Sequence, residues 1–138
     1  MIKKKWLILF ILLVIGVIFY FININSKVPY SISEDNVKTI YCQYPAGGTK
    51  ILPVSESDKK IIISEIGKMR ETKTSGAVGT VMYNFVIELT DGHKVEFIQN
   101  TRNVIELYSD IDKIQRKIKA PKTAEFIRRF IKENNIEL

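Results

Sequence analysis

Cys42 and His93 are the side chains that come closest to catalytic chemistry, and each is the single residue of its kind in the chain. A thiolate beside an imidazole makes a nucleophile and base pair, and an imidazole among carboxylates can hold a metal ion. No base lies beside Cys42 in the sequence, and His93 directly follows Asp91 and Gly92, which form a turn. The pattern therefore favours a buried structural thiol and an exposed imidazole, and it predicts no catalytic residue, metal ligand or cofactor.

Glu106, Asp110 and Asp112 bring three carboxylates close together in the sequence. Such groups can do acid–base chemistry or bind calcium, but this spacing lacks the glycine and the distal glutamate of a calcium-binding loop. We interpret the three residues as part of a solvated turn.

Positive charge gathers near the C-terminal end of the chain. Between residues 113 and 133, only Glu125 and Glu133 are acidic, whereas eight residues are basic: Lys113, Arg116, Lys117, Lys119, Lys122, Arg128, Arg129 and Lys132. This set is either the solvated face of a strand and a helix or a surface for anionic lipid, a wall polymer or an acidic envelope protein. No helix-turn-helix or aromatic RNA-binding pattern accompanies it, so nucleic acid is not an expected partner.

The elements that must position these residues begin with an apolar segment that starts at Trp6 and ends at Ile22. It contains no charged residue and directly follows Lys3, Lys4 and Lys5. As a helix it would span about 25 Å, a little less than the roughly 30 Å hydrocarbon core of a membrane. The length favours a retained membrane anchor. A cleaved signal peptide is the alternative, although no Ala-x-Ala cleavage pattern follows the segment.

The basic residues before the apolar segment indicate its orientation. Three lysines precede it and only Lys27 follows closely, which places the N-terminus in the cytoplasm and the rest outside the membrane. We expect a cytoplasmic basic tail (1–5), a transmembrane signal-anchor (6–22), a stalk (23–36) and one extracytoplasmic domain (37–138). After the tail, 18 Lys and Arg face 15 Asp and Glu, so the exported part is only moderately basic.

Strands and helices of the domain follow from hydrophobic periodicity. Strands are predicted over 37–44, 50–54, 81–90 and 104–108, with a further strand that contains Val95 and Phe97 and returns from a two-residue turn at Asp91 and Gly92. Helices are predicted from 55 to about Thr72 and around Phe126.

Residues 112–120 fit two patterns, because Ile114 and Ile118 suit both helical spacing and strand alternation. We favour a strand, since Ala120 precedes Pro121 and is pushed toward extended geometry. The element order β-β-α-β-β-β(-β)-α predicts an α+β domain, with an antiparallel sheet and two helices packed on it.

The lysine-led anchor, the stalk, the Asp91-Gly92 turn and the Ala120-Pro121-Lys122 entry to a final helix resemble the layout of small uncharacterised envelope proteins of low-GC Gram-positive bacteria. This resemblance implies an extracytoplasmic domain and carries over no functional residue. The first functional hypothesis is a membrane-anchored, non-enzymatic binding module with a basic C-terminal surface. The alternatives are a secreted or anchored small hydrolase or metal-dependent enzyme that uses Cys42, His93 and the acidic turn, or an accessory subunit of a membrane complex. The sequence leaves the oligomeric state open.

Overall fold

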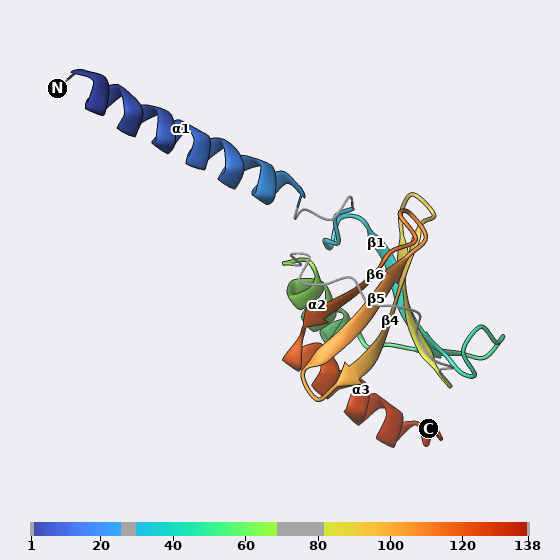
Figure 1. Ribbon diagram of the computed structural model, residues 1–138. Coiled ribbons are helices and arrows are strands. Elements are labelled where there is room, and N and C mark those ends of the chain that lie inside the picture. Colours follow the sequence, from blue (N-terminus) through green and yellow to red (C-terminus); the bar gives the residue numbers. More distant parts are fainter. Residues whose placement is uncertain (1, 26–29, 69–81, 138) are drawn as a thin grey trace.

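The computed structural model describes residues 2–25, 30–68 and 82–137, which form an N-terminal helix and an α+β domain (Figure 1). The elements in chain order are α1 (Ile2–Asn25), β1 (Val37–Gln43), β2 (Ile51–Pro53), α2 (Glu56–Ile66), β3 (Asn84–Leu89), β4 (Lys94–Thr101), β5 (Val104–Ser109), β6 (Gln115–Lys119) and α3 (Pro121–Glu133). The predicted fold class is confirmed, and residues 115–119 form a strand as expected.

Helix α1 stands apart from the domain as a separate rod (Figure 1). It is long and apolar enough, by length and composition, to cross a membrane between Lys3 and Phe21. Every side chain in that span is exposed. Within this chain α1 is therefore not a buried core helix, and its length and composition fit both a membrane span and a signal sequence.

The strands in the described residues form one sheet in the order β2-β1-β3-β4-β5-β6. Every neighbouring pair is antiparallel. Strand β3 lies in the middle of the sheet because the connection through α2 brings the chain back beside β1 rather than beside β2. Pro53 is on edge strand β2, where its missing N–H leaves no ladder position unpaired.

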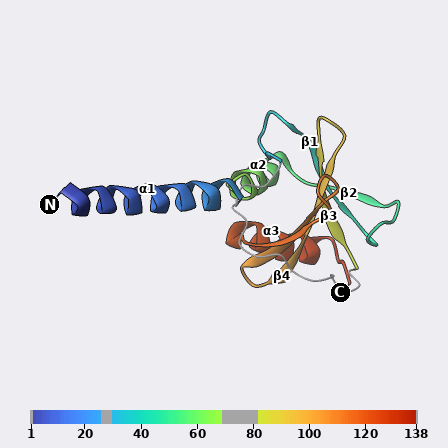
Figure 2. The same ribbon diagram turned by 45° about the horizontal axis from the view of Figure 1, so that its top comes forward.

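The core lies between one face of the sheet and the two helices α2 and α3, which cover the same face (Figures 1 and 2). Its centre is Phe85, whose ring is fully buried and lies 5.2 Å from Phe97 and 5.3 Å from both Phe126 and Phe130. The alternation predicted for this strand is confirmed, since Tyr83, Phe85, Ile87 and Leu89 belong to this core, whereas Asn84 and Val86 are buried on the other face.

Helix α2 begins as the sequence indicates and ends earlier. The Ser55 hydroxyl accepts the backbone N–H of Asp58 and caps the helix where the sequence predicts its start. The helix was expected to reach about Thr72, but it ends at Ile66, with Gly67 as its C-cap. Residues 69–72 lie outside the described residues. At this end of the helix the backbone of Gly67 lies close to the backbone of Ile32, because a Cβ on Gly67 would lie 2.6 Å from the Ile32 carbonyl oxygen.

The contact between Gly67 and Ile32 packs the end of the expected stalk against the domain. Ile32 is 5% exposed and belongs to the core, while Tyr30 packs against the core and lies 5.7 Å from the Arg116 guanidinium. The stalk expected over 23–36 therefore includes residues that pack on the folded body, and folded structure begins before Val37.

The β3–β4 hairpin differs from the predicted two-residue turn. Gly92 has a positive φ of 90°, whereas Asp91 does not have a positive φ. The Leu89 N–H donates to the His93 carbonyl, and the Gly92 N–H donates to the Leu89 carbonyl. Both bonds are typical of a three-residue loop that ends in a glycine bulge, where only the last position needs a left-handed conformation. The β4–β5 turn is short, because β4 continues through Asn100 to Thr101 and β5 begins at Val104.

Candidate functional site

Cys42 and His93 do not form a site. Cys42 is fully buried in the core on β1, opposite Phe85, while His93 is exposed beside Leu89 at the other end of β3. Phe85 and Leu89 are four residue steps apart along the strand, which is about 13 Å. Burial raises the pKa of the Cys42 thiol to about 11, so its nucleophilic thiolate is disfavoured. The interpretation of Cys42 as a buried structural thiol is confirmed.

The acidic turn has structural partners. One Asp110 oxygen lies 3.1 Å from His93 Nδ1 and accepts the Lys94 N–H at the same distance. Asp112 accepts the Ile114 N–H and a 2.5 Å hydrogen bond from the Arg116 guanidinium. Burial opposes ionisation of Asp112, but these hydrogen bonds outweigh it and hold its pKa below the ordinary value of 3.8. Among the described residues, no group of three or more His, Cys, Asp or Glu is arranged to hold a metal ion.

The eight basic residues do not share one surface. Arg116, expected in the basic set, is 2% exposed and lies on the helix-covered side of the sheet, because it stands two residues before buried Ile118 and so shares its face. Lys117 and Lys119 alternate with it and lie on the opposite side. Arg129 is paired with Asp58 of α2. The remaining residues, Lys113, Lys122, Arg128 and Lys132, are exposed on the β5–β6 turn or on α3.

The second face of the sheet is the most distinctive surface of the domain. No helix or strand of the described residues covers it (Figures 1 and 2). One row of cross-strand partners runs over this face through Tyr41, Val86, Glu96, Tyr108 and Gln115. We call it the open face.

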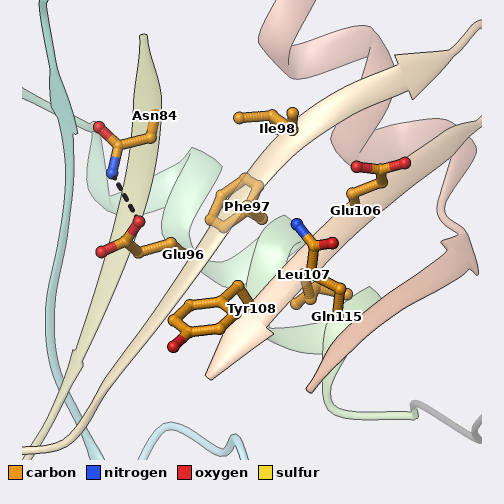
Figure 3. Close-up of a pocket in the computed structure, with 8 residues that line it drawn as sticks. All are labelled: Asn84, Glu96, Phe97, Ile98, Glu106, Leu107, Tyr108 and Gln115. Carbon is orange, nitrogen blue, oxygen red and sulfur yellow. Dashed lines mark hydrogen bonds between the residues drawn. The ribbon is translucent and has the colours of Figure 1, made fainter. Parts of the chain in front are cut away.

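A groove of about 140 Å³ lies on the open face over β3 to β6. Figure 3 looks onto it, with the helices behind the strands. Its lining residues are Asn84, Glu96, Phe97, Ile98, Glu106, Leu107, Tyr108 and Gln115. The carboxylates of Glu96 and Glu106, the Tyr108 ring and the Ile98 side chain therefore meet in one hollow, a mixture of polar and apolar groups that suits a small recognition site.

The polar groups of the groove are held in place by hydrogen bonds. The Asn84 amide donates to Glu96 Oε2 at 3.1 Å (Figure 3), and Asn84 itself is only 5% exposed. Glu106 accepts a 2.6 Å hydrogen bond from the Asn100 amide, and Lys117 Nζ lies 3.6 Å from the same oxygen. These contacts orient both carboxylates before any ligand arrives.

The sequence alone groups Glu106 with the acidic turn and does not indicate Asn84 or Glu96 as candidate binding residues. The groove depends on the pairing order β3-β4-β5-β6, which brings together residues up to 31 positions apart. One signal was present, because Asn84 and Glu88 alternate with the apolar residues of β3 and so belong to the opposite face.

Comparison of the chain with protein-family models, with curated proteins and with solved structures found no match in any of the three. The function must therefore be argued from the geometry alone.

Proposed function

We propose that this protein is a single-pass membrane protein whose extracytoplasmic domain is a non-enzymatic binding module, and that the open face is its binding surface. The observation that carries the proposal is the groove on a sheet face that no described element covers. A monomeric α+β domain needs helices on only one face, and the other face is then available for a partner.

The membrane part of the proposal is supported by α1 and by the lysines before it. The helix has the length and apolar composition of a membrane span, and positive residues flank its N-terminal end. The positive-inside rule then orients the domain outward. Retention of the helix rather than cleavage is favoured by its length.

The connection between the anchor and the domain is short. Helix α1 ends at Asn25, and Tyr30 already packs against the core. Five residue steps of fully extended chain reach at most about 18 Å. The domain is therefore held close to the bilayer, and its partner must be accessible at the membrane surface.

The binding reading is favoured over the enzymatic one by the arrangement of reactive groups. Cys42 is buried, and it lies far along the sheet from His93. The two carboxylates that share the groove, Glu96 and Glu106, accept amide hydrogen bonds, and among the described residues neither is hydrogen-bonded to a Cys, Ser or Thr side chain. Such groups suit recognition of a partner more than turnover of a substrate.

Photocrosslinking from the intact protein in its native membrane tests the proposal. A photoreactive amino acid at Tyr108, in the groove, is compared with one at Lys132, on the exposed side of α3. The proposal predicts one defined adduct from position 108, and loss of that adduct when Ile98 is changed to Arg. An adduct from position 132 alone would assign binding to the cationic side of α3 and contradict the open-face proposal.

A further inference from the structure

Three carboxylates lie on the strands of the open face, and two of them have a lysine partner. Glu88 accepts a 2.8 Å hydrogen bond from Lys38, which lowers the pKa of Glu88, and Glu106 has Lys117 at 3.6 Å. Glu96 is different. In the described parts of the chain Glu96 forms no ion pair, and its carboxylate accepts a hydrogen bond from the neutral amide of Asn84.

Two lysines of the open face, Lys94 and Lys117, interact with the other two carboxylates, Glu88 and Glu106. Lys94, two residues before Glu96, is the cross-strand partner of Glu88 and contributes to lowering its pKa. Glu96 thus carries a negative charge that the neighbouring strands do not neutralise. Its cross-strand partners are Val86 on one side and Tyr108 on the other.

The surroundings of Glu96 suit a cation with an apolar stem. The Tyr108 ring extends from β5 toward the strand that carries Glu96 (Figure 3), and Tyr108 is 36% exposed. The face of an aromatic ring attracts ammonium and guanidinium groups. Ile98 lines the groove beside Glu96 and Tyr108 and can contact methylene groups, whereas the side chains of Phe97 and Leu107 are buried on the core face.

We infer that the groove takes a lysine or arginine side chain presented by a partner protein, with Glu96 as its counter-ion and Tyr108 as its aromatic wall. The inference rests on the proposed function and names the chemistry of the partner. Asn84 preorients the carboxylate through Oε2 and leaves Oε1 for the incoming cation. An anionic partner at this site would meet the Glu96 carboxylate and would be repelled.

A titration of the full-length protein in neutral detergent micelles tests the inference, with N-acetyl-trilysine amide as the probe and N-acetyl-triglutamine amide as the neutral comparison. Backbone resonances of Glu96, Tyr108 and Gln115 are expected to shift and saturate with trilysine and to stay in place with triglutamine. Glu96→Gln, which keeps the side-chain shape, should raise the Kd about tenfold, and Tyr108→Leu about threefold.

Glu88→Gln is the matched control, because it removes a carboxylate from the same face that already has a lysine partner. It should change the Kd less than twofold. An unchanged trilysine affinity in Glu96→Gln, or an equal loss in Glu88→Gln, would overturn the inference and indicate diffuse charge attraction.

The crosslink from position 108 separates this inference from the proposed function. If the adduct survives Glu96→Gln and the trilysine shifts are absent, the open face binds a partner of other chemistry and the inference fails alone. If no adduct forms at position 108 and the shifts are also absent, both fail.

Discussion

The Glu65 carboxylate of α2 accepts the backbone N–H of Thr123 at 2.6 Å, and through its other oxygen the N–H of Lys122 at 3.1 Å. Helix α3 begins after Ala120, whose side chain cannot cap it, and Pro121 brings no N–H of its own. A residue of the neighbouring helix therefore supplies the N-terminal cap of α3, and its negative charge complements the helix dipole. Together with the Asp58–Arg129 pair, it fixes the two helices in an antiparallel arrangement.

Glu65→Ala should lower the free energy of unfolding by about 1 to 2 kcal/mol, the usual effect of losing a helix cap. Chemical denaturation followed by circular dichroism measures it. Ser64→Ala, at the adjacent exposed position of α2, should stay within about 0.5 kcal/mol of the parent protein. Equal stability of the two variants would show that the Glu65 contact does not stabilise α3.

Asp112 and Arg116 form the most buried ion pair among the described residues, with side-chain exposures of 15% and 2%. Asp112→Asn leaves the Arg116 charge without its carboxylate in the domain interior. Because Asp112 is partly exposed, we expect a loss of about 2 to 3 kcal/mol, below the 3 to 5 kcal/mol of fully buried pairs. Glu125→Gln, on the exposed side of α3, is the control.

The same pair predicts a pH dependence. The pKa of Asp112 is lower in the folded protein than its ordinary value of 3.8, so its contribution is complete above 3.8 and is lost as the pH falls through the folded pKa. The stability difference between the parent protein and Asp112→Asn should therefore shrink as unfolding is measured at decreasing pH below 3.8. A constant difference would contradict the role of the ionised carboxylate.

Gly67→Ala should loosen the attachment of residues 30–32 to the domain. The added Cβ would lie 2.6 Å from the carbonyl oxygens of both Ile32 and Ile63, so backbone must move. We expect a loss of about 1 to 3 kcal/mol and faster proteolysis near Tyr30. Gly16→Ala in α1, where nothing lies within 4 Å, should leave the unfolding of the domain unchanged. Similar behaviour of the two variants would mean that the close approach has no energetic role.

Cys42 should resist thiol reagents in the folded protein. Its side chain is buried and its pKa is raised to about 11, so both access and thiolate are lacking at neutral pH. Modification by iodoacetamide, followed by mass spectrometry, should be complete in denaturant and negligible without it. Thr49→Cys, placed at an exposed site in a Cys42→Ala background, should react in both conditions. Rapid labelling of Cys42 in the native protein would revive the catalytic alternative.

Much of the fold was predictable because it depends on local periodicity. Alternation identified β3, and the Ala120-Pro121 step separated β6 from α3. Arg116 shows where local reading fails. Its charge suggested the surface, whereas its two-residue spacing from Ile118 placed it on the covered face, and alternation was the better guide.

The remaining features depend on contacts between distant residues. The hydrogen-bond partners of Glu65 lie 57 and 58 positions away on α3, and no pattern within α2 indicates them. The end of α2 at Ile66 is linked to Ile32, far back in the sequence. The groove likewise needs the order of the strands, which a pattern within one strand does not contain.

The location of the domain is the claim on which the proposed function most directly depends. Alkaline phosphatase folds to an active enzyme only outside the cytoplasm, so a fusion of this enzyme after residue 137 of the full-length chain measures the location of the domain. Mass spectrometry of the membrane fraction shows whether α1 is retained. The account predicts active phosphatase, intact α1 in the membrane fraction, and loss of outward orientation when Lys3, Lys4 and Lys5 are replaced by Glu and lysines are added after Asn25. Inactive phosphatase on a membrane-bound parent chain, with the domain protected inside the cell, would contradict it.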